Sequence, residues 1–316
     1  MSAPIVVPTD FSPASAEALA YALRVARATG ARVHLIHAVS WPDAGPFEVP
    51  GEAPTATQEV AEEVALAREA LAEFVGDARD EVDLVVRHSN VPAFEVVDHA
   101  RRSGAGLVVM AACGRRTRPG LGAVTDEVVQ TAPCDVLLVP HSEDRRYSGG
   151  PPRRVLVPVD FSSASRPLVA FAAGLARDLG AAGLDLVHVL EPLPHPVRWL
   201  DETIVDLVPE IRQRAADALR ELSEGTVGKG DLDVELYVER GKPARTLART
   251  AEALGSDLVV VGPHAERPVF DRLLGSVAEG VARRARCPVL IARRSAAPGP
   301  HDEASVDPRS YEPEPA

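Results

Sequence analysis

An internal duplication is the feature that most constrains the fold of this sequence. The stretch "IVVPTDFSPASAEALAYALRVARATGA", from Ile5, aligns with "VLVPVDFSSASRPLVAFAAGLARDLGA", from Val155. Near the other end, "GAVTDEVVQTAPCDVLLV" from Gly122 aligns with "GSVAEGVARRARCPVLIA" from Gly275. The offset between the copies grows only from 150 to 153 positions along the chain, so nearly the whole sequence is one domain written twice.

The domain boundaries follow from the repeat and from composition. A chain of 316 residues is long enough for two domains of ordinary size. We predict domain 1 at residues 1–143 and domain 2 at residues 153–295. The polar, Gly- and Pro-rich stretch at 144–152 is typical of a linker. The tail at 296–316 has too little apolar content to pack, so we expect it to be disordered.

Short apolar runs alternate with longer amphipathic segments in each copy. In domain 2, "VLVPV", "LDLVHVL", "DVELYVE", "DLVVVG" and "PVLIA" are strand-like, and residues 166–179, 204–222, 244–254 and 277–285 have helical spacing. Strands that are apolar on both faces and alternate with helices indicate a parallel sheet between two helical layers. The predicted fold class is therefore α/β, with two tandem Rossmann-like domains, each an open five-stranded parallel sheet with helices on both faces.

The ends of the first helix in each copy carry capping signals. Ser12 precedes Pro13, a favoured pair for an N-cap and a first helical residue, and we expect Ser162 to cap the matching helix of domain 2. Gly30 and Gly180 follow these helices, where a left-handed residue ends a helix well.

Charge and apolar patterning exclude several classes of protein. Acidic residues outnumber basic ones, 46 against 34, and the arginine pairs are interspersed with acids, so nucleic acid is not an expected partner. No apolar run is long enough for a membrane span, and the N-terminus lacks the pattern of a secretory signal. We therefore expect a cytoplasmic protein with no membrane partner.

The cysteines and histidines do not form metal-binding motifs. Three cysteines lie far apart without a CxxC pair; Cys134 and Cys287, which precede the last strand of each copy, are expected to be buried thiols. His34, His37 and its counterpart His188 are interpreted as structural residues, because their spacing does not match a metal site.

The sequence also predicts where a ligand would lie. In an open parallel sheet, ligands bind beyond the carboxyl ends of the strands where strand order reverses. Asp160 follows the first strand of domain 2 and could bond ribose hydroxyls. The loop after Gly262, which leads to a helix near Gly275, could present backbone N–H groups to phosphate. This combination predicts a nucleotide.

The blocks "VLVPVDFS", "HVLEP" and "DLVVVGPHAERPVFDRLLGSVAEGVARRARCPVLIA" resemble the universal stress protein (UspA) superfamily, and their repetition over residues 4–140 and 153–293 resembles a tandem member. The resemblance implies an adenine nucleotide alpha hydrolase-like fold. ATP-binding members show G-x-x-G-x9-G-[S/T], which matches Gly262, Ala265, Gly275 and Ser276. Ala265 replaces the second glycine, and its methyl group occupies space where the backbone would approach phosphate.

The resemblance implies ATP or ADP as the ligand, with Mg²⁺ accompanying it, and a set of binding residues in domain 2. They are Pro158, Asp160, Val189, Val261, Gly262, His264, Ala265, Gly275, Ser276 and Val277.

Domain 1 keeps less of the pattern, with Asp10, Gly114 and Gly122 as its candidates. Ala111 replaces the first glycine, and Ala123 replaces the hydroxyl-bearing residue. The loop between Gly114 and Gly122 is also two residues shorter than in domain 2. We therefore expect domain 2 to be the main nucleotide-binding domain.

Three functions remain open at this point. The first is a stress-response regulator that binds ATP or ADP without fast catalysis, because no catalytic residue set accompanies the loop; it would not be an enzyme. The second is an interaction module with vestigial sites, whose domains pair through their last strands as family dimers do, with a further homodimer or an unknown protein as partner. The third is a slow ATPase.

Overall fold

The structure is a computed structural model that describes residues 2–40, 58–113, 121–141, 152–192, 201–228, 230, 232–262 and 275–293. The predicted tail lies outside these residues, and so does the predicted linker except for Pro152. The strands are β1 (Ile5–Pro8), β2 (Val33–Val39), β3 (Val82–His88), β4 (Leu107–Ala111), β5 (Asp135–Val139), β6 (Arg154–Pro158), β7 (Gly183–Leu190), β8 (Asp233–Arg240), β9 (Leu258–Val261) and β10 (Val289–Ile291). The helices are α1 (Pro13–Thr29), α2 (Gln58–Val75), the 3-10 helix η1 (Gly76–Glu81), α3 (Pro92–Ser103), α4 (Ala123–Thr131), α5 (Ser165–Asp178), α6 (Asp201–Thr226), α7 (Pro243–Leu254) and α8 (Ser276–Ala282).

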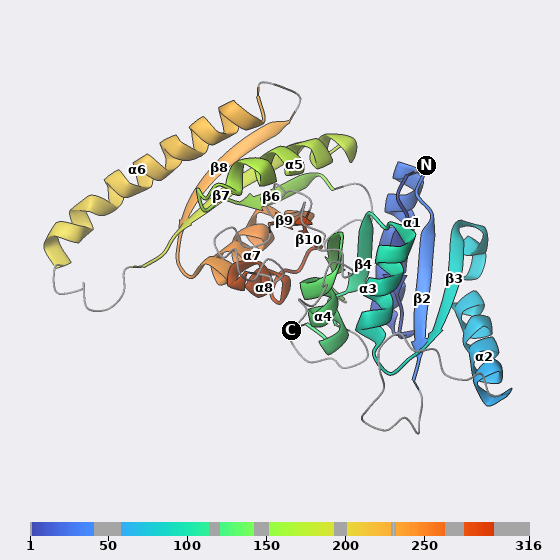
Figure 1. Cartoon of the computed structure of the whole chain (residues 1–316). Coiled ribbons are helices and arrows are strands. Elements are labelled where there is room, and N and C mark those ends of the chain that lie inside the picture. The colour runs from blue at the N-terminus through green and yellow to red at the C-terminus, as the bar shows by residue number, and fades with distance from the viewer. Residues whose placement is uncertain are drawn as a thin grey trace, which may run out of the picture.

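The strands form one sheet in the order β3-β2-β1-β4-β5-β10-β9-β6-β7-β8 (Figure 1). All neighbours within each half are parallel, and the order reverses beside β1 and β6, the first strand of each copy. The predicted fold class is confirmed, including the five strands and four helices of domain 2. The main differences are at helix ends: α6 begins before residue 204 and α8 ends before residue 285.

The two halves join through their last strands. β10 pairs antiparallel with β5, so that Leu290 lies opposite Leu137 and Ile291 lies opposite Val136. These four side chains are buried. Each strand would otherwise be a sheet edge with unpaired backbone groups, and the pairing removes both edges at once. The domains therefore share one continuous sheet, with the strand pairing implied by the resemblance.

Apolar residues on both faces of the strands explain the two helical layers. One core cluster packs the sheet against α1, α2, α5 and α6, and the other packs it against α3, α4, α7 and α8. Neighbouring residues such as Val6 and Val7 belong to opposite clusters, because side chains alternate along a strand. Cys134 and Cys287 are buried in the second cluster, as predicted.

The first helix of each copy begins differently. Ser12 is the N-cap of α1 and accepts a hydrogen bond from the Ser15 N–H, as predicted. The prediction for Ser162 is wrong: α5 begins at Ser165, after a turn, and has no side-chain cap. The cause lies in Pro167, which has no N–H and would clash with the carbonyl four residues earlier if the helix began as early as in domain 1. The predicted left-handed glycines are confirmed, with φ 68° at Gly30 and 69° at Gly180.

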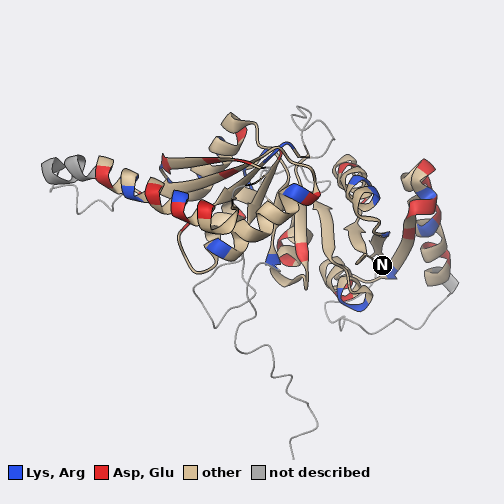
Figure 2. Cartoon of the chain, turned by 90° about the horizontal axis from the view of Figure 1, so that it is seen from above, with Lys and Arg blue, Asp and Glu red and all other residues tan. Residues whose placement is uncertain are grey.

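Acidic and basic side chains alternate over the exposed helices (Figure 2). Over the ranges that the structure covers, none of the helices combines the length and the apolar character needed to cross a bilayer.

A buried carboxylate lies near the start of the strands of domain 2. Asp185 on β7 is fully buried, and both of its oxygens accept hydrogen bonds from Arg154 Nε at 3.1 Å. Arg154 also donates to Asp233 at 3.0 Å. A buried carboxylate without a positive partner is strongly unfavourable, so Arg154 makes this part of the sheet possible.

Arg154→Ala should therefore lower the free energy of unfolding by about 3 kcal/mol, because it leaves the Asp185 charge buried and unpaired. Urea unfolding followed by circular dichroism measures this. The control is Arg220→Ala, which breaks an exposed ion pair with Asp217 and should cost less than about 1 kcal/mol. Equal effects of the two substitutions would contradict the assignment.

The surroundings of two helical glycines predict opposite effects on stability when each is replaced by alanine. A Cβ at Gly280 of α8 would lie 2.5 Å from the Ala244 Cβ of α7, whereas a Cβ at Gly174 of α5 would meet nothing within 4 Å. Gly280→Ala should cost about 1–3 kcal/mol, because the two helices must separate. Gly174→Ala should stabilise by about 0.5–1 kcal/mol through the lower backbone entropy of the unfolded chain. Thermal unfolding of both variants measures these changes in stability. A change of the same sign in both variants would contradict this packing.

Candidate functional site

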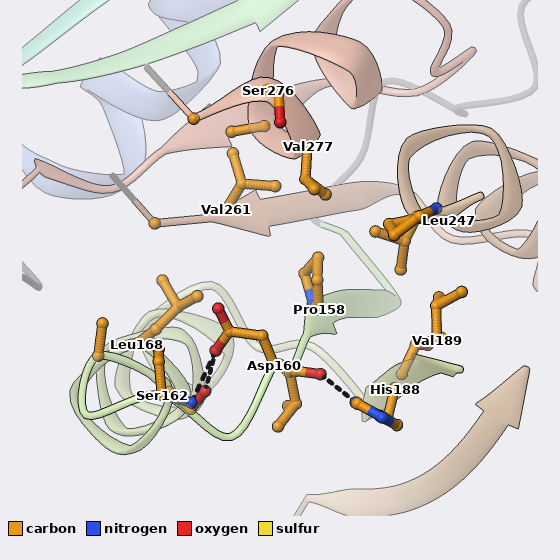
Figure 3. Close-up of a pocket in the computed structure, with 18 of the residues that line it drawn as sticks. Pro158, Asp160, Ser162, Leu168, His188, Val189, Leu247, Val261, Ser276 and Val277 are labelled. Carbon is orange, nitrogen blue, oxygen red and sulfur yellow. Dashed lines mark hydrogen bonds between the residues drawn. The ribbon is translucent and has the colours of Figure 1, made fainter. Parts of the chain in front are cut away.

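A pocket of about 360 Å³ lies beyond the carboxyl ends of β6, β7 and β9 in domain 2 (Figure 3). Every site residue predicted for domain 2 that the structure describes lines it: Pro158, Asp160, Val189, Val261, Gly262, Gly275, Ser276 and Val277. The other two predicted residues, His264 and Ala265, lie outside the described residues. The pocket lies where the strand order reverses, which is the position that the sequence predicts.

Asp160 forms the turn that leaves β6. Its Oδ1 accepts hydrogen bonds from the Ser162 N–H at 2.9 Å and from the Ser165 hydroxyl at 2.7 Å. Burial raises the pKa of the Asp160 carboxyl, but the hydrogen bonds from Ser162 and Ser165 outweigh burial and lower the pKa below its ordinary value. The group is therefore a carboxylate at neutral pH. The hydrogen bonds from the Ser162 N–H and the Ser165 hydroxyl both end on Oδ1, so Oδ2 can face a ligand.

The residue after Asp160 has an unusual backbone conformation. Phe161 has φ 61°, and its counterpart Phe11 has φ 62°, in the left-handed region that non-glycine residues rarely adopt. The Phe161 ring lies 4.5 Å from the His188 ring, and Phe11 lies at the same distance from His37. These contacts hold the turn in both domains.

The two histidines are structural, as the sequence predicts. His188 Nδ1 lies 2.8 Å from the Val159 carbonyl, and His37 Nδ1 lies 2.8 Å from the Thr9 carbonyl. Each bond ties the end of the second strand to the residue that follows the first strand. His34 lies elsewhere, with its Nδ1 3.0 Å from His99 Nε2.

Small residues form the opposite wall of the pocket. Gly275 is the N-cap of α8, with φ −63° and ψ 147°, and Ser276 is the first helical residue. Gly262 follows β9; a Cβ there would lie 3.4 Å from Leu168, which is ordinary contact. The lack of side chains at both glycines leaves the backbone open to a ligand on this wall.

In the matching region of domain 1, a backbone hydrogen bond joins the two ends of the loop. The Gly122 N–H donates to the Ala112 carbonyl at 3.0 Å, so the backbone group in front of α4 already has a partner. The Thr125 hydroxyl donates to the Ala111 carbonyl at 3.1 Å, where domain 2 has Ala278 instead. Asp10 accepts from the Ser12 N–H at 3.1 Å, as Asp160 does in its own turn. Gly114 lies outside the described residues.

Several pocket residues do not follow from the sequence reasoning. Pro243 and Leu247 of α7 line the pocket although they follow the third strand of domain 2, and Glu191 follows β7. These residues come from α7 and from the position after β7, whereas the sequence prediction rests mainly on the loops after the first and fourth strands. One signal was present: Pro92 and Pro243 begin matching helices in the two copies.

Comparisons with known proteins agree with this architecture. The family model "Universal stress protein family" matches residues 1–140 and 152–293. Universal stress protein Rv2005c of Mycobacterium tuberculosis is 32% identical over 199 residues, which are 60% of this chain and 63% of that protein. The chain thus spans somewhat less than two thirds of that relative.

Two further matches cover nearly the whole chain. Universal stress protein Rv2623 of Mycobacterium tuberculosis is 32% identical over 301 residues, which are 92% of this chain and 96% of that protein. A solved universal stress protein from Archaeoglobus fulgidus, 18% identical, covers 92% of this chain and 96% of its own with a TM-score of 0.60, a likeness of fold alone. Because the family model and these relatives match both copies, the chain belongs to the universal stress protein family, as a member with two tandem domains.

Proposed function

We propose that this protein is a cytoplasmic stress-response regulator that binds ATP or ADP in the pocket of domain 2. The observation that carries the proposal is the convergence of the described site residues of domain 2 on one pocket. They come from three separate stretches of the sequence, and a merely structural role for each would not require them to surround a common space. The pocket volume of about 360 Å³ is within the range of small-molecule sites.

The walls of the pocket differ in chemistry in a way that suits a nucleotide. Val189, Pro158 and Leu247 supply an apolar surface for a base. The Asp160 carboxylate, with one oxygen held by the turn, can accept a hydrogen bond from ribose through the other. Gly262 and Gly275 carry no side chains, so phosphates can approach the backbone of the opposite wall at these two positions.

Mg²⁺ would enter this pocket with the nucleotide. The ion usually binds through phosphates, waters and one or two carboxylates. Among the described lining residues the acidic ones are Asp160, which is assigned to the ribose, and Glu191, which is left to approach the ion. The charge of the ion would also offset the repulsion between these carboxylates and the phosphates.

We propose binding without fast hydrolysis. Among the described lining residues, the one histidine has its Nδ1 at the Val159 carbonyl, and the Asp160 oxygen nearest Ser165 is engaged by that hydroxyl. These contacts hold a turn rather than position a water for attack. A single-turnover assay with labelled ATP separates this proposal from a slow ATPase.

The contacts in domain 1 favour a role other than nucleotide binding for that domain. The closed contact between Gly122 and Ala112 supports a vestigial site there. We therefore propose one nucleotide for each chain. Domain 1 would then bind no nucleotide. It would complete the shared sheet and offer a surface to a second copy of the chain or to another protein.

Gly275→Val should abolish ATP binding measured by equilibrium dialysis, because the side chain fills the wall that faces the phosphates. The backbone of Gly275 has negative φ, so valine fits the fold. The matched control is Gly122→Val at the corresponding position of domain 1, with φ −67°, which should leave binding unchanged. Undetectable binding by the unaltered protein at millimolar ATP would refute the proposal.

Asp160→Asn should raise the Kd for ATP about tenfold, because a hydrogen bond to a charged acceptor is replaced by a weaker neutral one. The amide oxygen can still accept from Ser162 and Ser165, so the turn is kept. Asp10→Asn, the same change in the matching turn of domain 1, is the control and should have no effect. An equal loss in both variants would place the nucleotide elsewhere.

A further inference from the structure

A second cavity, of about 580 Å³, lies between the two domains. It shares no lining residue with the nucleotide pocket. Its floor includes Leu107, Leu137 and Leu258, on the face of the sheet that packs against α1 and α5, and the C-terminal turns of these two helices flank it. The cavity therefore lies on one face of the sheet, over the junction of the two domains.

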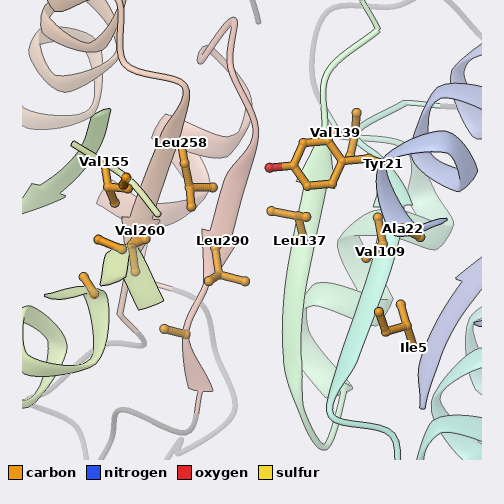
Figure 4. Packing of buried hydrophobic residues seen from close by; sticks show 14 of the residues in the cluster. Ile5, Tyr21, Ala22, Val109, Leu137, Val139, Val155, Leu258, Val260 and Leu290 are labelled. Carbon is orange, nitrogen blue, oxygen red and sulfur yellow. The ribbon is translucent and has the colours of Figure 1, made fainter. Parts of the chain in front are cut away.

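The floor of this cavity comes from both domains and is mostly apolar, with one buried carboxylate, Asp135 of β5. Figure 4 shows Ile5 and Leu137 on the domain 1 side of the junction and Leu258 and Leu290 on the domain 2 side. Each of these four side chains is less than 7% exposed. The antiparallel pairing of β5 with β10 holds the two sides of the floor together.

The walls of the cavity are two matching helices with different polarity. Tyr21 and Val25 of α1 occupy positions that correspond to Phe171 and Leu175 of α5 in the repeat, and all four line the cavity. Arg24 also lines it, whereas the corresponding residue on α5 is Gly174. The repeat therefore makes two apolar walls, and only the α1 wall carries a guanidinium.

Arg24 is held in place without a carboxylate partner. Its guanidinium lies over the Tyr21 ring, 4.9 Å from the ring centre. In the described part of the chain it forms no ion pair. A cation that is ordered against an aromatic ring at the mouth of an apolar cavity is suited to an anionic group on an apolar ligand.

We propose that this cavity binds a small carboxylate with an apolar body, such as a medium-chain fatty acid or an aryl carboxylate. The apolar body lies on the leucine floor, and the carboxylate pairs with Arg24. The volume is in the range of small-molecule sites, and such sites favour domain interfaces with an apolar lining and few polar groups. Asp178 lines the α5 wall, where it is exposed to water, and disfavours a second negative group on the ligand.

Isothermal titration calorimetry of the full chain with decanoate, below its micelle concentration, tests the proposal. We expect saturable binding of one decanoate. Arg24→Gln should raise the decanoate Kd about tenfold, because it removes a charge-assisted hydrogen bond, and should not change the Kd of decan-1-ol. Ala28→Trp, at an exposed lining position on α1, should weaken both ligands by filling the cavity.

The matched control is Arg27→Gln on the same helix. Arg27 is paired with Glu81 at 2.7 Å and does not line the cavity, so this change should leave the decanoate Kd unaltered. Thermal unfolding checks that each variant is folded, and ATP binding, measured in parallel, should not change in Arg24→Gln.

Three results would overturn the proposal. The first is an absence of saturable decanoate binding, and the second is binding that Ala28→Trp leaves intact. The third is tighter binding of decylammonium than of decanoate, which would make Asp178 the recognition group. A crystal structure in which a segment of the chain itself or a second copy fills the cavity would also overturn it.

Discussion

The antiparallel pairing of β5 with β10 is the contact on which the rest of the architecture depends. Without it, each domain would end in an apolar strand with unpaired backbone groups. With it, one sheet runs through both domains, and each core cluster contains residues of both copies. Arg283, which follows α8, adds an ion pair to the junction, since it lies 3.4 Å from Asp126 of α4. The exposed ion pair adds little free energy, so the apolar strand pair carries the association.

The repeat gives both domains the same turn after the first strand. In each copy the aspartate carboxylate accepts a hydrogen bond from the backbone N–H of the serine two residues later. The phenylalanine between them has positive φ. A histidine of the second strand is hydrogen-bonded to the carbonyl of the residue before the aspartate. Left-handed backbone at a non-glycine residue costs about 1–3 kcal/mol, which the surrounding contacts must offset. Because both domains keep this turn, it does not by itself distinguish the two halves.

The distinction lies on the opposite wall. In domain 1 the loop is two residues shorter, and its ends meet through the bond from Gly122 to Ala112. Thr125 strengthens the closure with a hydrogen bond to the end of β4, and its counterpart Ala278 has no hydroxyl to do the same. Small changes in one loop thus separate two otherwise matching halves, while the first strand and its turn stay the same.

The sequence by itself determined the tandem repeat, the α/β class, the parallel sheet within each half and eight of the residues that line the pocket. These follow from local periodicity and from residues such as Asp160 and Gly275, which lie next to strands or helices that the pattern already predicts. The late start of α5 also has a local cause in the sequence, Pro167. The prediction of an earlier start followed the similarity to domain 1 and was therefore wrong.

Only the tertiary structure decided the features that join distant segments. The sequence does not reveal that Pro243 and Leu247 face the nucleotide pocket, that Gly122 bonds Ala112, or that Arg24 lies beside a cavity between the domains. Each depends on how far two packed elements approach each other. That distance is set by side chains from the whole core, whereas the sequence pattern records only which face of each element is apolar.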